Sequence, residues 1–208
     1  MSAKLYGISG SPYVQAAMLG LTEKGVDYEL IRIVPPEHKG AEHLARHPFG
    51  KVPAFDHDGF ALYETQAILR YVDQAFPGPL LEPATPQETA RMNQIIGIVD
   101  CYMIRAWSAD ISFERIMAPR FFGRPCDEAR VAAALPQAQV CAAAVEALIA
   151  GPYLTGPTLT LADLHLAPHY NYFRQTPEGE AMLADKPRLA QWFTHMSQRE
   201  SVKALLLD

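Results

Sequence analysis

Two different hydrophobic periods alternate along the first part of the chain. Runs with the alternation of a strand occupy residues 3–8 and 26–33, and apolar positions with helical spacing occupy residues 12–24, 37–46 and 65–76. Between the last two helices, "VPAFDHDGFALYE" holds two short strand patterns around Asp58-Gly59, which predicts a hairpin. The expected order of elements in this part is therefore βαβαββα.

The pattern changes after this part. "FPGPLLEPATPQE" places four prolines and a glycine within thirteen residues, which is typical of a linker between domains. Beyond it there is no convincing strand pattern, and helical periodicity covers residues 87–118, 127–150, 161–174 and 187–199. Pro136 is expected to kink the second of these helices or to lie in its first turn. We therefore predict an α/β domain at 1–78, a linker at 79–86 and an all-helical domain at 87–208.

Composition narrows the class of protein. The chain has 208 residues, of which 49% are hydrophobic and 20% charged, so it can bury a substantial core. A net charge of -5 argues against a broad nucleic-acid-binding surface. The start, "MSAKLYG", lacks the features of a signal peptide, and Asp100 and Glu146 interrupt the longest apolar runs, so no membrane span is expected. The three cysteines have no metal-binding spacing, which favours a reducing cytoplasm and no metal cofactor.

Four short strings, in order, resemble the glutathione S-transferase superfamily. They are "LYGISGSPY" at 5–13, "HPFGKVPAF" at 47–55, "ETQAILRY" at 64–71 and "YLTGPTLTLADL" at 153–164. The resemblance covers nearly the whole chain and is nearest to the serine-type members, phi-like and bacterial. It implies a thioredoxin-like N-terminal domain joined to an all-helical C-terminal domain, usually in a homodimer, with glutathione as co-substrate.

The turn at "SGSPY" is the candidate catalytic element. Glutathione reacts as a thiolate, and both a hydroxyl donor and a helix N-terminus favour the ionised sulfur. Ser11 precedes Pro12, which is favoured at the first position of a helix, so Ser11 suits both roles. Two alternatives stay open, because Ser11 can be an ordinary N-cap and Ser9 can carry the catalytic hydroxyl instead.

The other strings supply candidate glutathione-binding residues. By resemblance, Pro53 follows a cis peptide bond and the backbone of Val52 pairs with the cysteinyl part of glutathione. Glu64 and Thr65 begin a helix whose N–H groups suit the γ-glutamyl carboxylate, while Glu64 takes the ammonium. Each pair also has a purely structural interpretation, as a strand-edge proline or as a helix cap.

Charged residues near the second helix complete the predicted glutathione site. Lys39 and Lys51 can reach the glycyl carboxylate, and His38 is a further candidate, although all three can equally be solvated loop residues. Thr160 and Asp163 have the spacing of a capping box, so Asp163 is expected to support the fold.

The resemblance also points to a pocket for the electrophile. Its candidate residues are Tyr13, Ile104, Trp107 and Ile111, of which the last three share a face of a regular helix, though such a stripe is often core. Asp100 is a candidate for contact with the glutathione of a partner subunit.

The function we expect is the transfer of the glutathione thiolate to electrophilic, largely apolar small molecules. One alternative keeps glutathione but changes the reaction to isomerisation, dehalogenation or peroxide reduction. A second alternative is a non-catalytic protein that uses the same fold for protein interactions. A thioredoxin-type disulfide oxidoreductase is disfavoured because the chain has no CxxC pair.

Overall fold

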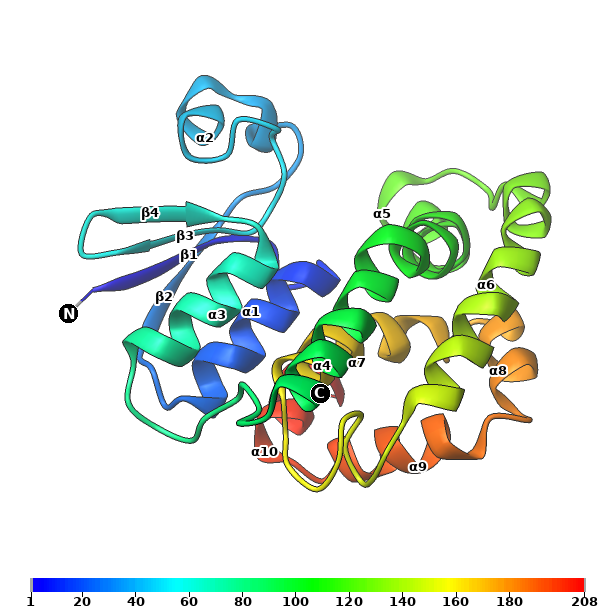
Figure 1. Ribbon diagram of the computed structural model, residues 1–208. Coiled ribbons are helices and arrows are strands. Elements are labelled where there is room, and N and C mark those ends of the chain that lie inside the picture. The colour runs from blue at the N-terminus through cyan, green and yellow to red at the C-terminus, as the bar shows by residue number, and fades with distance from the viewer. Residues whose placement is uncertain (1, 208) are drawn as a thin grey trace. The chain divides into compact units, whose positions relative to one another are not determined.

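A computed structural model describes residues 2–207 and divides the chain into two compact units. The first unit runs to Glu82 and includes the residues from Glu200 onward, whereas the second unit is Pro83–Arg199. Figure 1 gives the order of the elements in each unit. A four-stranded sheet with helices is followed by a unit that is helical throughout the part described, so the predicted fold class is confirmed.

The first unit is built on a mixed sheet with the strand order β2-β1-β3-β4. Its elements are β1 (Ala3–Gly7), α1 (Pro12–Glu23), β2 (Tyr28–Arg32), η1 (Glu37–Lys39), α2 (Ala41–Arg46), β3 (Ala54–His57), β4 (Phe60–Tyr63) and α3 (Thr65–Ala75). β1 pairs in parallel with β2 and antiparallel with β3, and β3 forms the predicted hairpin with β4. Figure 1 shows α1 and α3 side by side across one face of the sheet.

The core of the first unit lies between the sheet and these two helices. Leu5 and Phe55 from the strands meet Val14, Leu21 and Ile68 from the helices, and each of these side chains is almost fully buried. Burying each such side chain contributes about 1.5–3 kcal/mol relative to leaving it exposed. The same packing fixes where α1 and α3 begin relative to the strands.

A buried ion pair extends the first unit into the predicted linker. Lys24 Nζ lies 3.0 Å from Asp73 Oδ1, and both side chains are almost inaccessible. Lys24 also donates to the carbonyl of Pro79 at 3.0 Å, and Asp73 accepts from the backbone N–H groups of Leu81 and Glu82. Residues 79–82 are thus held by the first unit, which corrects the expectation of a linker over 79–86.

The C-terminal residues also differ from the expected division. Ser201 Oγ donates to the Glu23 carboxylate in α1, and Leu205 packs against the core of the first unit. The short elements α10 (Glu200–Val202) and η3 (Lys203–Leu207) therefore belong with the α/β unit and not with the helical domain predicted at 87–208.

The second unit contains the long helices. Its elements are α4 (Pro86–Ile98), η2 (Val99–Met117), α5 (Ala118–Phe122), α6 (Glu128–Leu148), α7 (Leu161–Phe173), α8 (Pro177–Leu183) and α9 (Pro187–Met196). α6 and α7 both pack against η2. Pro136 lies inside α6 and not in its first turn. α8 lies outside the four predicted helices, although Thr176 caps it and Pro177 is its first residue, as with Thr85 and Pro86 in α4.

Asp163 stabilises the helical unit through hydrogen bonds, as its capping-box spacing predicted. Its Oδ1 accepts from the N–H of Leu154 and from Trp192 Nε1, both at 2.8 Å. Its Oδ2 accepts from the backbone and the hydroxyl of Thr160, which completes a capping box at the start of α7. A fully buried carboxylate with four donors joins a loop and two helices, so its role is structural.

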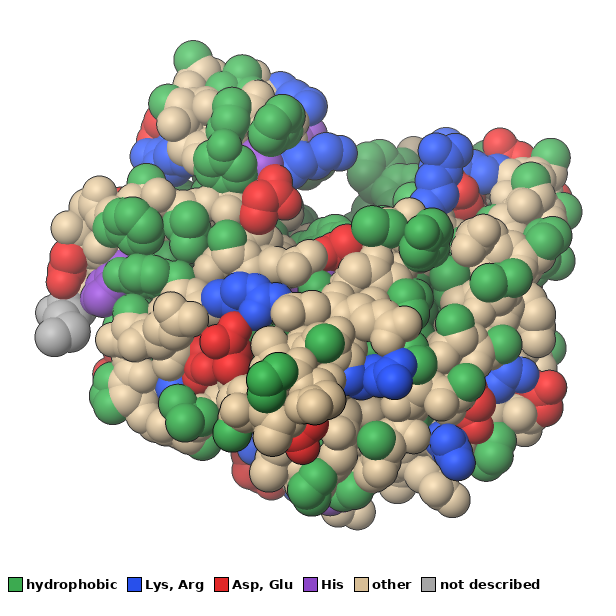
Figure 2. All heavy atoms as spheres, viewed as in Figure 1, with side chains coloured by type: hydrophobic (Ala, Val, Ile, Leu, Met, Phe, Trp, Pro, Cys, Tyr) green, Lys and Arg blue, Asp and Glu red, His purple; other side chains and the backbone are tan. Residues whose placement is uncertain are grey.

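Two features of the structure bear on whether the chain contacts a membrane or nucleic acid. α6 is long and apolar enough to cross a membrane, by length and composition alone, with a mean hydropathy of 1.4 and a third of that stretch buried. Glu146 still interrupts the apolar run in this helix, and helices at the core of soluble proteins pass the same test of length and composition. On the face shown in Figure 2, acidic and basic side chains are interspersed.

Candidate functional site

Three of the predicted strings meet at one end of the sheet. Tyr6 at the end of β1 pairs with Ala54 at the start of β3, and Ala54 pairs with Tyr63 at the end of β4. The turn after β1, the residues before β3 and the start of α3 therefore meet at the same end of the sheet. β2 runs parallel to β1, so the chain leaving β2 toward η1 also starts from this end.

Ser11 occupies the N-cap of α1, but its side chain does not cap the helix. Its backbone has the extended conformation usual for this position, with φ -83° and ψ 126°, and Pro12 follows at the first helical position. The hydroxyl makes no capping hydrogen bond, and the first turn of α1 contains no acidic side chain. The partial positive charge at this helix end is therefore not neutralised by a carboxylate of its own first turn.

The Val52–Pro53 peptide bond is cis, as the resemblance implied. Pro53 is buried, and Val52 is half-buried directly before β3. His43 in α2 supports this segment, because its Nε2 lies 2.7 Å from the carbonyl oxygen of Lys51. A carbonyl can only accept, so the ring nitrogen donates and the tautomer of the neutral imidazole is fixed.

Glu64 and Thr65 form the junction between β4 and α3. Glu64 has φ 74°, a conformation in which a side chain other than that of glycine is strained, and it caps no N–H group of the helix. Thr65 is buried, and its hydroxyl donates to the carbonyl of Tyr13 at 3.5 Å, which joins the first turns of α3 and α1. The Glu64 side chain is exposed beside an uncapped helix N-terminus.

Basic side chains gather on the segment after β2. Lys39 Nζ donates to the carbonyl of Phe49 at 3.4 Å, and a Cβ on Gly50 would lie 2.8 Å from the His38 carbonyl oxygen. Only glycine fits this approach, and its φ of +56° also favours glycine. Burial lowers the pKa of His38, and the charge of Lys39 lowers it further, so the imidazole is neutral at pH 7.

His47 links this basic segment to Glu64. Its ring is buried and lies 4.8 Å from the ring of Tyr63, measured between centroids. Burial lowers the pKa of His47, while the Glu64 carboxylate acts on it in the opposite direction. Lys39 and Lys51 are exposed, so this end of the first unit combines accessible cations, an exposed carboxylate and a helix N-terminus.

The second unit does not provide the helix face that was predicted for the electrophile pocket. Residues 99–117 form a π-helix, whose wider turn does not align positions 104, 107 and 111 as a regular α-helix does. Trp107 stacks on Phe173 at 4.2 Å and donates from Nε1 to the Ala138 carbonyl, so it belongs to the core. Ile111 is fully buried as well, whereas Ile104 and Tyr13 are partly exposed.

Asp100 is engaged inside its own unit. His165 Nε2 lies 2.8 Å from Asp100 Oδ1, and the imidazole of His165 is fully buried. One turn along α7, His169 Nδ1 lies 2.7 Å from the hydroxyl of Ser108, and burial lowers the pKa of His169 to about 3. The side chain of Asp100 thus has a structural partner, which argues against the expected contact with another subunit.

Sequence reasoning missed His43 and the backbone conformation of Glu64. His43 lies in the string "EHKGAEH" at 37–43, but nothing in that string indicates that its partner is the carbonyl of Lys51. Ser9 is exposed in the turn before Ser11. Among residues 2–207, no cluster of three or more His, Cys, Asp or Glu side chains has the arrangement of a metal site.

Comparisons with known proteins show which family the chain resembles over its length. The family description "Glutathione S-transferase, N-terminal domain" matches residues 5–80, and "Glutathione S-transferase, C-terminal domain" matches residues 98–200. Glutathione S-transferase 4 of Zea mays is 32% identical over 95% of this chain and 89% of its own. A glutathione S-transferase of Hyoscyamus muticus is 30% identical over 92% of each chain.

Solved structures share the fold over nearly the whole length. Glutathione transferase F2 from Populus trichocarpa superposes with a TM-score of 0.87 at 26% identity, covering 99% of this chain and 97% of its own. A glutathione S-transferase I bound with lactoylglutathione has a TM-score of 0.87 at 30% identity, covering 100% and 99%. The similarity therefore extends through both units.

Proposed function

Because the chain belongs to the glutathione S-transferase family, we propose that Ser11 donates a hydrogen bond to the thiolate of bound glutathione. The observation that carries this proposal is the Ser11 side chain, which stands at the N-cap of α1 without capping it. A hydrogen bond to a charged group contributes about 1.5–3 kcal/mol, and a helix N-terminus adds roughly 0.3–1 kcal/mol. Together these favour the ionised sulfur at neutral pH, where a free thiol is mostly protonated.

Glutathione would bind at the end of the sheet where the three strings meet. The exposed Glu64 carboxylate suits the ammonium of the γ-glutamyl group, and the uncapped start of α3 at Thr65 suits its carboxylate. The backbone of Val52, held before the cis bond to Pro53, pairs with the cysteinyl part. Each of these groups has a hydrogen-bonding partner of the right kind in the tripeptide.

The glycyl carboxylate would meet the basic segment. Lys39 and Lys51 are the exposed cations there. Burial lowers the pKa of His38, and the positive charges of both lysines lower it further. A neutral His38 can donate one hydrogen bond but contributes no charge. We assign the charge contact to the two lysines and a supporting contact to His38.

The reaction we propose is conjugation. The thiolate attacks an electrophilic carbon and a C–S bond forms. Either a leaving group departs with its bonding electron pair, or the π electrons of the attacked double bond move onto the far atom of the acceptor, which then takes a proton from solvent. Electrophiles are expected to be small and largely apolar, and Tyr13, partly exposed in the first turn of α1, is the candidate that the first unit offers for contact with them. Trp107 and Ile111 are not part of this proposal, because they are buried.

The same proposal includes a homodimer in the cytoplasm. Isologous dimers are the commonest oligomers of soluble proteins. The three cysteines, Cys101, Cys126 and Cys141, form no disulfide, which fits a reducing compartment.

A direct assay tests the proposal. Purified protein is incubated with glutathione and 1-chloro-2,4-dinitrobenzene, and the conjugate is followed by its absorbance. We expect saturable turnover that falls by about tenfold or more in Ser11→Ala, in line with one lost charge-assisted hydrogen bond. Binding of glutathione without turnover on any electrophile of a broad panel would reject conjugation in favour of a non-catalytic role.

A further inference from the structure

Two histidines are the buried side chains of the segment that carries the predicted glycyl-binding cations. Within residues 33–50, the only buried side chains are His43 and His47, whose residues are 2% and 3% exposed. The apolar side chains of Leu44 and Phe49 are exposed instead. The buried groups that attach this segment to the first unit can therefore take up protons.

This segment lies outside the core of the first unit. None of residues 33–50 belongs to the apolar cluster between the sheet and the helices α1 and α3. α2 packs chiefly against η1 and β4, and Figure 1 shows it apart from the layer that α1 and α3 form on the sheet. Segments with few buried apolar contacts open at a lower free energy than the whole unit. We therefore expect this segment to open without unfolding of the sheet.

His43 attaches the segment through a neutral ring. Its Nε2 donates to the carbonyl of Lys51 at 2.7 Å, whereas its Nδ1 is buried and has no hydrogen-bond partner within residues 2–207. In the neutral ring Nδ1 carries no proton, so the single N–H of the ring is paired. A second proton would create a buried N–H on Nδ1 without an acceptor, which costs free energy.

His47 has the same feature. Its ring centroid lies 4.8 Å from that of Tyr63 on β4 and 6.2 Å from that of Phe49. Its Nδ1 is also buried, with no hydrogen-bond partner in the part of the chain that the structure describes. An imidazolium carries N–H groups on both nitrogens, so protonation would bury a charge together with an unpaired donor.

The two rings and their charged neighbours disfavour a proton on His47. The rings of His43 and His47 are stacked with centroids 6.2 Å apart. Burial lowers the pKa of His47, the Glu64 carboxylate acts in the opposite direction, and the charges of His43 and Lys51 lower it further. Glu64 is also the group proposed to bind the ammonium of glutathione, so a bound ligand would weaken its support for an imidazolium.

The other charged groups around the segment are mostly cations. The guanidinium of Arg46 lies 4.6 Å from the ring centroid of Tyr6 and pairs with Glu42 at 3.0 Å. On η1, burial lowers the pKa of His38, and the charge of Lys39 lowers it further. These cations oppose any further positive charge on the segment.

We propose that residues 33–51 open when His47 takes up a proton, so that glutathione binds more weakly in mildly acidic solution. This inference rests on the proposed glutathione site, because the segment carries Lys39 and Lys51 and directly precedes Val52. Linkage is reciprocal, so glutathione bound to the closed segment displaces the proton from His47.

The pH range follows from the direction of the shift. The pKa of His47 is lowered from 6.5 in the folded chain, and opening removes the burial that lowers it. The open form therefore binds more protons as the pH falls below about 6.5, and the free energy of opening decreases there. Uptake of one proton changes the opening equilibrium by at most about tenfold per pH unit.

Hydrogen exchange of the free protein measures this opening. Deuterium uptake of peptides from residues 33–51 is followed by mass spectrometry between pH 7.5 and 5.5 and corrected for the intrinsic effect of pH, with peptides from α3 as the internal reference. We expect the opening equilibrium constant of this segment to rise by about threefold to tenfold over this range, and that of α3 to stay constant. His47→Phe keeps a ring against Tyr63 but cannot be protonated, so it should remove the rise.

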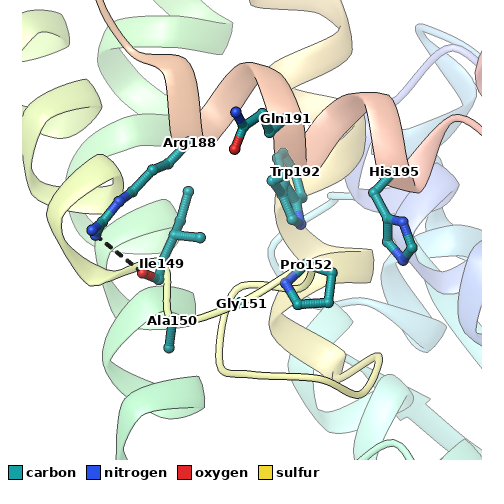
Figure 3. Close-up of a pocket in the computed structure, with 8 residues that line it drawn as sticks. All are labelled: Ile149, Ala150, Gly151, Pro152, Arg188, Gln191, Trp192 and His195. Carbon is teal, nitrogen blue, oxygen red and sulfur yellow. Dashed lines mark hydrogen bonds between the residues drawn. The ribbon is translucent and has the colours of Figure 1, made fainter.

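His195→Phe is the matched control. His195 lies in the helical unit, beside the pocket drawn in Figure 3, and its ring contacts that of Tyr153 with centroids 4.7 Å apart. This variant should keep the pH dependence of the parent protein. His47→Gln is a second variant without a titratable group and should also lose the rise if His47→Phe does not fold. Exchange that is independent of pH in the parent protein, or a rise that persists in these His47 variants, overturns the proposal.

S-methylglutathione separates the segment from the chemistry at sulfur. It keeps the ammonium and both carboxylates of glutathione but has no thiol to ionise. Calorimetry should give several-fold weaker binding to the parent protein at pH 5.5 than at pH 7.5, and equal binding at both values to His47→Phe. Equal affinity of the parent protein at both values would overturn the link to glutathione. Absence of binding at pH 7.5 would instead contradict the proposed glutathione site, and the exchange result alone would then decide the opening.

Discussion

His43 Nε2 lies 2.7 Å from the carbonyl oxygen of Lys51, and this hydrogen bond joins α2 to the segment that precedes the cis Val52–Pro53 bond. The imidazole is almost fully buried, so water cannot replace it as a donor. We infer that His43 positions the backbone proposed to pair with glutathione.

Replacing His43 should weaken glutathione binding without changing the chemistry at sulfur. His43→Ala leaves the Lys51 carbonyl without this donor, and the lost hydrogen bond should cost about 0.5–1.5 kcal/mol in the free energy of unfolding. We expect calorimetry to give weaker binding and the bound thiol to keep its pKa. His38→Ala is the matched control on the same segment and should have a smaller effect on stability. A thiol pKa that moves with His43 would contradict this division of roles.

Glu64 combines a charge with a strained backbone, and two variants separate these contributions. Glu64→Gln retains the shape and removes the charge, so we expect glutathione to bind about tenfold more weakly or worse. Glu64→Gly also removes the strain at φ 74° and should be more stable to denaturant than Glu64→Ala, by roughly 1 kcal/mol or more. Binding by Glu64→Gln that matches the parent protein would remove Glu64 from the proposed site.

A buried carboxylate in the helical unit makes stability depend on pH. Glu114 is fully buried and accepts from Arg124 Nη1 and Nη2, both at 2.7 Å, and from the Asp127 N–H at 3.2 Å. The hydrogen bonds from Arg124 lower the pKa of Glu114 from 4.5 to about 2. Because the folded pKa is depressed, this stabilisation is fully present above about pH 4.5 and is lost as pH falls toward 2.

Denaturant unfolding at a series of pH values checks this dependence. Glu114→Gln should be less stable than the parent protein above pH 4.5, and the difference should shrink as the pH approaches 2. Glu29→Gln, an exposed position on β2, is the control and should show no such trend. A Glu114→Gln difference that stays constant across this range would rule out the assigned linkage.

The proposed dimer is tested by mass. Light scattering should give about twice the 23.0 kDa mass of one chain at micromolar concentration. Asp100→Asn should leave both the mass and glutathione affinity unchanged, because Asp100 is paired with His165 in its own unit. A monomer mass at this concentration would contradict the proposal that the chain forms a dimer.

Local patterns predicted the fold well. The order of elements, the Asp58-Gly59 hairpin and membership of the glutathione S-transferase family are confirmed. These features depend on hydrophobic periodicity, turn residues and short strings, all of which can be recognised in a single sequence. The first compact unit extends to Glu82, because Asp73 accepts from the N–H groups of Leu81 and Glu82 and Lys24 donates to the carbonyl of Pro79. The second of these contacts joins residues far apart in the chain, so the local sequence does not indicate it.

The site residues that lie within the quoted strings could be predicted from the sequence. Ser11, the Val52–Pro53 step and the Glu64–Thr65 pair could be chosen from their neighbours in the sequence, and their roles stay predictions. His43 could not, because its partner is determined by tertiary structure. The predicted face of Ile104, Trp107 and Ile111 was wrong because it assumed an α-helical period where the chain forms a π-helix.

The central claim concerns which serine acts on the sulfur. Ser11→Ala removes the donor, so the pKa of the bound glutathione thiol should rise by roughly one to two units, since one unit is about 1.36 kcal/mol. Stability should change little, because the Ser11 hydroxyl makes no capping bond. Ser9→Ala, two residues away in the same turn, is the matched control.

The most direct measurement is the ultraviolet absorbance of the bound thiolate as a function of pH in the parent protein, Ser11→Ala and Ser9→Ala. We expect the titration midpoint to rise only in Ser11→Ala, with glutathione affinity changed less than turnover. A midpoint that rises in Ser9→Ala and stays in place in Ser11→Ala would contradict the assignment of Ser11.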